Sequence, residues 1–182
     1  AFSIVILMLV VWVVQRSPAV NWVAWILALP VFILNLLSAQ TLDPNLIAWT
    51  ALLEGILYFY GAGSLIAYML GDTDVTTDEL FAAGATYTLL AWGFAYFYLA
   101  CQTWIPGSII STVTSGRALT FIELLFLSFT NLSSTGLSDI VPVTTLSRVI
   151  VMLEQFAGVG YIAIVVSRLI GMSLQRKTEK KG

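Results

Sequence analysis

The sequence predicts an all-α, polytopic membrane protein, and two observations support this prediction. Hydrophobic residues make up 59% of the 182 residues and charged residues only 10%, with a mean hydropathy of +0.93. A soluble domain of this composition would expose a continuous apolar surface. In addition, five apolar stretches approach or exceed the roughly 20 residues that a helix needs to cross a bilayer. They occupy residues 1–16, 20–39, 45–70, 78–104 and 144–172.

Turn and charge signals divide these stretches and orient them. Ser17-Pro18 precedes the second stretch, Asp43-Pro44 opens the third with an acidic cap, and Gly71-Asp72 ends the third. The first stretch lacks a basic leader and a small-residue cleavage site, so we expect a transmembrane helix there, with further residues upstream. Residues 173–182 form a basic tail. Because basic residues favour the inner side, we expect a multi-pass plasma-membrane protein with a cytoplasmic C-terminus.

Composition also excludes several function classes. The chain contains no histidine and a single cysteine, which excludes histidine-ligated metals, histidine-based catalysis and an intrachain disulfide. The run Gly61-Ala62-Gly63-Ser64 is not a nucleophile elbow, so an intramembrane enzyme is disfavoured. We expect no organic cofactor and no nucleic-acid partner. Because residues 17–116 contain no lysine or arginine, we interpret residues 1–71 as three accessory helices and not as a charged voltage sensor.

Residues 78–172 form a second unit with a short apolar segment in its middle. We divide it into an outer helix at 78–104, a turret at 105–117, a pore helix at 118–131, a filter at 132–139 and an inner helix at 144–172. A helix over 118–131 would be roughly 20 Å long, too short to cross the bilayer. Irregular backbone is tolerated at membrane depth only where protein buries it or it lines an aqueous cavity. The sequence therefore predicts a re-entrant helix followed by an ion-coordinating loop.

The loop carries the residue types that an alkali cation needs. Its backbone carbonyls and the hydroxyls of Ser133, Ser134 and Thr135 are hard oxygen ligands. Gly136 permits a positive φ, which lets successive carbonyls aim the same way. A helix that descends into the membrane also directs its partially negative C-terminal end toward a bound cation.

The run from Leu125 to Met172 resembles the pore helix, filter and inner helix of bacterial two-transmembrane potassium channel domains. The filter of that family reads Thr-Thr-Val-Gly-Tyr-Gly-Asp. Its positions fall, in order, on Ser133, Ser134, Thr135, Gly136, Leu137, Ser138 and Asp139. The resemblance also places the family's outer-mouth proline, inner-helix arginine and hinge glycine on Pro142, Arg148 and Gly158.

The filter departs from that family at two positions. Ser138 replaces a glycine whose conformation costs a residue with a Cβ about 1 kcal/mol per subunit. Leu137 removes a phenol hydroxyl that ties the family's filter to its pore helix. The single-glycine run Thr-Gly-Leu-Ser also resembles the filter loops of Trk/Ktr-type potassium-uptake proteins, which carry four loops in one chain. One loop cannot enclose an ion, so we expect a cyclic homotetramer in the lipid bilayer.

Two functions follow from this interpretation. The first is passive conduction of monovalent cations, K⁺ before Na⁺, through the tetrameric filter. The alternative is a non-conducting, channel-like membrane receptor or assembly subunit with a degenerate filter, which the Ser138 departure favours. For Asp139 two roles remain open: a ring of carboxylates at the outer mouth, or a cap on the amides of its own loop.

Several intramembrane residues have two interpretations each. Gly158 and Gly160 are candidates for a gating hinge or for close helix packing. Glu54 is a proton or ion site, or a structural glutamate near Asn35. For the remaining acids on the pore helix and the inner helix, hydrogen bonding behind the filter is favoured over ion binding. These acids are Glu123 and Glu154.

Overall fold

The structure, a computed structural model, describes residues 21–41, 43–71, 77–114, 116–167 and 170–171. The expected first helix at 1–16 and the basic tail at 173–182 lie outside the described residues. The helices are α2 (Asn21–Thr41), α3 (Pro44–Gly71), α4 (Thr77–Trp104), α5 (Phe121–Leu132) and α6 (Thr145–Tyr161), and a π-helical turn, Ile162–Val166, continues α6.

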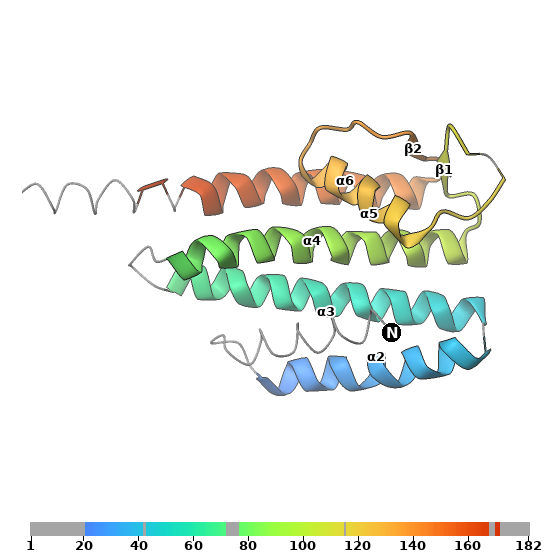
Figure 1. The fold of residues 1–182 in the computed structure, drawn as a ribbon, viewed down its shortest axis with the longest axis horizontal. Helices are drawn as coiled ribbons and strands as arrows, with labels where there is room; N and C mark the ends of the chain where they lie inside the picture. The colour runs from blue at the N-terminus through green and yellow to red at the C-terminus, as the bar shows by residue number, and fades with distance from the viewer. Residues whose placement is uncertain (1–20, 42, 72–76, 115, 168–169, 172–182) are drawn as a thin grey trace, which may run out of the picture.

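Four of these helices lie side by side, in the order α2, α3, α4 and α6 (Figure 1). The short helix α5 packs against both α4 and α6, at the end of the bundle that carries the two short strands (Figure 1). Among the described residues, two helical segments are long and apolar enough to cross a membrane, Pro44–Gly71 and Thr145–Val165. The chain is thus mostly helical, as predicted.

A two-stranded ribbon was not predicted. Strand β1 (Ile109–Ser111) pairs antiparallel with β2 (Ile140–Pro142), so part of the expected irregular turret is joined to the segment after the filter. The carbonyl oxygen of Ser108 then accepts hydrogen bonds from the amide of Val143 and the hydroxyl of Ser147, each at 2.8 Å. These contacts attach the start of α6 to the turret.

Glycines let aromatic rings enter the interface between α3 and α4. A Cβ on Gly55 would collide with the ring of Phe97, and a Cβ on Gly93 would lie 3.0 Å from the ring of Phe59. Small residues of this kind allow helix backbones to approach closely inside a membrane, where packing drives association. The two helices therefore approach each other closely where these glycines lie.

Gly158 serves the same purpose between α6 and the end of α5. A Cβ at this position would collide with the backbone carbonyl of Leu132, whereas a Cβ on Gly160 would meet nothing within 4 Å. Helical hydrogen bonding becomes irregular after both glycines, in the π-helical turn Ile162–Val166. This geometry favours close packing as the role of Gly158.

We expect Gly158→Ala to destabilise the protein by about 1–3 kcal/mol, because the added methyl group forces α5 and α6 apart. Gly160→Ala is the matched control, since it adds the same methyl group to the same helix in open space. Thermal unfolding in detergent, followed by circular dichroism, measures both variants. Equal unfolding temperatures for the two variants would contradict the packing role.

Candidate functional site

The start of α5 is held by a capping box. The Thr120 hydroxyl accepts a hydrogen bond from the backbone amide of Glu123. In return, the Glu123 carboxylate accepts a hydrogen bond from the backbone amide of Thr120, at 2.7 Å. The same carboxylate takes two hydrogen bonds from the Arg117 guanidinium, at 2.6 and 2.9 Å. Glu123 thus lies about 14 Å along the helix from Leu132 and the filter. The expectation that Glu123 hydrogen-bonds behind the filter is wrong.

At the other end of α5, the filter loop folds back onto the helix. The carbonyl oxygen of Thr130 accepts the amides of Thr135 and Gly136, at 3.0 and 3.1 Å. It also lies 3.1 Å from the hydroxyl of Thr135 and 3.2 Å from that of Ser133, both of which donate to it. Two of the three hydroxyls expected to face an ion therefore contact the pore helix.

The backbone of the filter alternates in handedness. Ser133 has φ −78°, Ser134 +57° and Gly136 +63°, whereas Thr135 is not in the left-handed region. Alternation of this kind directs successive backbone N–H groups to one side, where they form a concave site for an oxygen atom, called a nest. Here the N–H groups of Thr135 and Gly136 bind the Thr130 carbonyl oxygen in this way. Because trans peptides point N–H and C=O in opposite directions, the carbonyls of Ser134 and Thr135 are both directed away from α5.

The strain in the loop lies at a different residue from the one expected. Among the described residues, Ser134 is the non-glycine residue with a positive φ. This backbone conformation costs a residue with a Cβ about 1–2 kcal/mol. Ser138 does not have a positive φ, so the predicted penalty at that position is wrong. Its hydroxyl accepts the amide of Ile140 at 3.0 Å. The neighbouring Leu137 is 78% exposed.

Asp139 connects the end of the filter to the turret. Its Oδ2 accepts the Ser111 hydroxyl at 2.8 Å, and its carbonyl oxygen accepts the amide of Thr112 at 2.7 Å. The carboxylate therefore binds β1 and not an amide of its own loop. The residue itself stays exposed at the mouth of the loop.

Behind α5, the side chain of Glu154 joins three helices. It is fully buried, and it accepts hydrogen bonds from the hydroxyls of Tyr98 on α4 and Ser128 on α5. The Ser128 hydroxyl also lies 2.7 Å from the carbonyl oxygen of Ala91. These contacts fix the depth at which α5 sits between α4 and α6.

Glu54 lies apart from the filter, at the interface of α2 and α3. It is 5% exposed, and the Asn35 amide donates a hydrogen bond to its Oε1 at 2.6 Å. The structure thus brings Glu154 to the pore helix, Glu123 to the turret and Glu54 to the accessory helices.

Two features of the site escaped the sequence analysis. The capping box could have been predicted from the sequence, because Thr120 and Glu123 have the spacing and residue types of that motif. The contact between Ser111 and Asp139 could not have been predicted from a local pattern, since the two residues lie far apart in the chain and are brought together by the two-stranded ribbon.

Comparisons with known proteins identify one family. The sequence model of the ion channel family matches residues 56–174, nearly two thirds of the chain, from the second half of α3 through α6. This match agrees with the expectation of a channel pore module. Searches of curated proteins and of solved structures found no match.

The contact between Arg117 and Glu123 predicts a pH dependence of stability. The guanidinium and the Thr120 groups hold the pKa of Glu123 at about 2, below its usual 4.5. A lowered pKa in the folded state stabilises the protein above pH 4.5, and this contribution is lost as the pH falls toward 2. Thermal unfolding between pH 6 and pH 3 should therefore show a steeper loss for the wild type than for Glu123→Gln. Parallel curves would contradict the role of this carboxylate.

Proposed function

The chain belongs to the ion channel family, and from this premise we propose that it conducts monovalent cations passively, K⁺ before Na⁺. The conduction path is the filter from Ser133 to Asp139, contributed by four copies of the chain around one axis. In this proposal five helices span the plasma membrane, the C-terminus is cytoplasmic, and α5 enters the bilayer and returns through the filter loop.

One observation supports this proposal above the others: the adjacent carbonyls of Ser134 and Thr135 are directed away from the helix that carries them. The cause is that the amides of Thr135 and Gly136 are bound to Thr130 on the opposite side. Rings of backbone carbonyls replace the hydration shell of an alkali cation. The C-terminal end of α5 adds a partial negative charge close to the same place.

The outer surface of α6 supports assembly into a ring. Along this helix, large apolar side chains are exposed in the single chain, with Phe156 at 80%. Side chains of this kind contact either lipid or neighbouring helices. Cyclic assembly would place them against neighbouring subunits and bring four filter loops to one axis. The exposed residues are Leu146, Val149, Met152, Leu153, Phe156 and Val159.

A specific observation also favours a second candidate, a non-conducting, channel-like receptor or assembly subunit. The hydroxyls of Ser133 and Thr135 are held at the Thr130 carbonyl, on the α5 side of the loop. They therefore do not lie on the side to which the carbonyls of Ser134 and Thr135 are directed, and fewer oxygen ligands face one site than the sequence suggested. A filter with fewer ligands replaces less of the hydration shell.

Potassium flux into liposomes that contain the purified protein tests the proposal. We expect flux in the wild type and a loss of at least about tenfold in Gly136→Ala. Alanine at φ +63° costs about 1–2 kcal/mol per subunit, and a factor of ten needs only about 1.4 kcal/mol. Within one subunit no atom lies within 4 Å of the added Cβ, so the loss would not come from a clash inside the subunit.

Gly107→Ala is the matched control, because it places a methyl group at a positive φ of +78° in the turret, outside the filter, with no atom within 4 Å. We expect it to conduct like the wild type. Absence of wild-type flux, with tetramers present, would refute the channel function. Conduction that appears only in Ser138→Gly would instead support the non-conducting alternative.

A further inference from the structure

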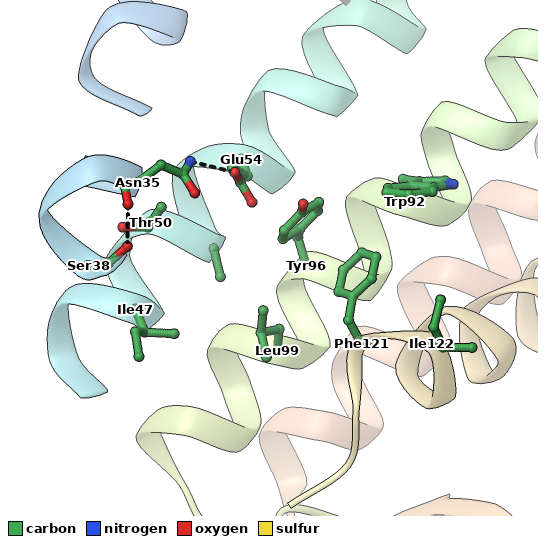
Figure 2. Close-up of a pocket in the computed structure, with 11 residues that line it drawn as sticks. Asn35, Ser38, Ile47, Thr50, Glu54, Trp92, Tyr96, Leu99, Phe121 and Ile122 are labelled. Carbon is green, nitrogen blue, oxygen red and sulfur yellow. Dashed lines mark hydrogen bonds between the residues drawn. The ribbon is translucent and has the colours of Figure 1, made fainter. Parts of the chain in front are cut away.

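A cavity of about 380 Å³ lies between α2, α3, α4 and the start of α5, away from the filter (Figure 2). Its wall is mixed: one part is polar and comes from α2 and α3, and another part is aromatic and comes from α4 and α5. The residues that decide its chemistry are Asn35, Glu54, Trp92, Tyr96 and Phe121.

The aromatic part consists of three rings, and the ring of Phe121 contacts the other two. The ring of Phe121 lies 5.3 Å from that of Trp92 and 4.7 Å from that of Tyr96, measured between centroids. All three are labelled in Figure 2 on the same side of the cavity. The faces of such rings attract a cation that comes within about 6 Å.

The polar part holds a carboxylate that has no cationic partner among the described residues. Glu54 is 5% exposed and is bound by the neutral amide of Asn35. Residues 17–116 contain no lysine, arginine or histidine. Of the two arginines that flank this range, Arg16 lies outside the described residues, and Arg117 is bound to Glu123. A charged carboxylate inside a membrane is costly unless an opposite charge lies beside it.

We propose that this cavity binds a small organic ammonium ion, with Glu54 as its counter-charge and Trp92, Tyr96 and Phe121 as its aromatic wall. The ammonium group belongs either to a free amine or to a lipid headgroup, since the same chemistry recognises both. Phe121 is also the first residue of α5. A bound ion would therefore contact the pore helix directly, and any effect on conduction rests on the proposed function.

Calorimetric titration of the purified full chain in lipid-free detergent tests binding. The probes are benzylammonium and its neutral analogue, benzyl alcohol. We expect Glu54→Gln to weaken benzylammonium binding by at least about tenfold, or about 1.4 kcal/mol, and to leave benzyl alcohol nearly unchanged. Asp43→Asn is the matched control, because it removes an exposed carboxylate at the start of α3. Equal benzylammonium affinity in the wild type and Glu54→Gln would overturn the proposal.

A second variant keeps the test valid if Glu54→Gln does not fold. Trp92→Leu retains the carboxylate and removes one ring, and we expect it to weaken benzylammonium binding more than benzyl alcohol binding. An equal loss for both probes would overturn the aromatic role.

Vesicles distinguish the two sources of the ammonium group. Phosphatidylglycerol is anionic and attracts benzylammonium to its surface, so binding is taken in each lipid as the difference between the wild type and Glu54→Gln. A smaller difference in phosphatidylethanolamine than in phosphatidylglycerol would identify the headgroup as the occupant, and an equal difference would identify a free amine. Potassium flux with benzylammonium present then tests coupling to the pore helix. Because calorimetry does not need conduction, a failed flux assay leaves the binding result standing, and failed binding leaves the channel function standing.

Discussion

The arrangement of this protein depends on one buried carboxyl group, that of Glu154 on α6. It contacts hydroxyl groups from two other helices, Tyr98 on α4 and Ser128 on α5, and no solvent reaches it. Leaving a buried polar group without partners costs about 1–3 kcal/mol. The three helices therefore have one mutual position in which all of these groups are satisfied. That position sets where α5 ends, and with it where the filter begins.

From this fixed helix, different contacts secure the segments on either side. The chain enters α5 through a paired contact between the side-chain amide of Gln102 and the backbone of Leu119. It leaves α5 through the convergence of the filter amides on Thr130, and it reaches β2 through the contact of Asp139 with Ser111. The filter loop is thus tied at both ends. Its strained backbone at positive φ persists because these contacts determine it from both sides.

The accessory helices connect to the pore helix through Phe121. The ring of this residue packs at a tilt against two rings of α4, and the residue also lines the cavity that contains Glu54 and begins α5. In our proposal, an ion bound in the cavity would therefore contact the helix that carries the filter. No charge has to move through the membrane field for such coupling. This fits helices that lack basic residues between positions 17 and 116.

The sequence by itself determined the helices, because the length and apolarity of a stretch are local properties. The ends of α3 and α4 lie within one residue of the expected stretches at 45–70 and 78–104. It also determined that Gly136 has a positive φ, since glycine adopts this conformation without a steric penalty. Only the tertiary structure decided that Ser134, and not Ser138, carries the strain. The backbone angle of a non-glycine residue depends on where its neighbours' amides find acceptors, and here that acceptor is Thr130. The two-stranded ribbon could not be predicted from the sequence either. Strands of three residues are too short to show an alternating pattern, and they form only when distant segments of the chain meet.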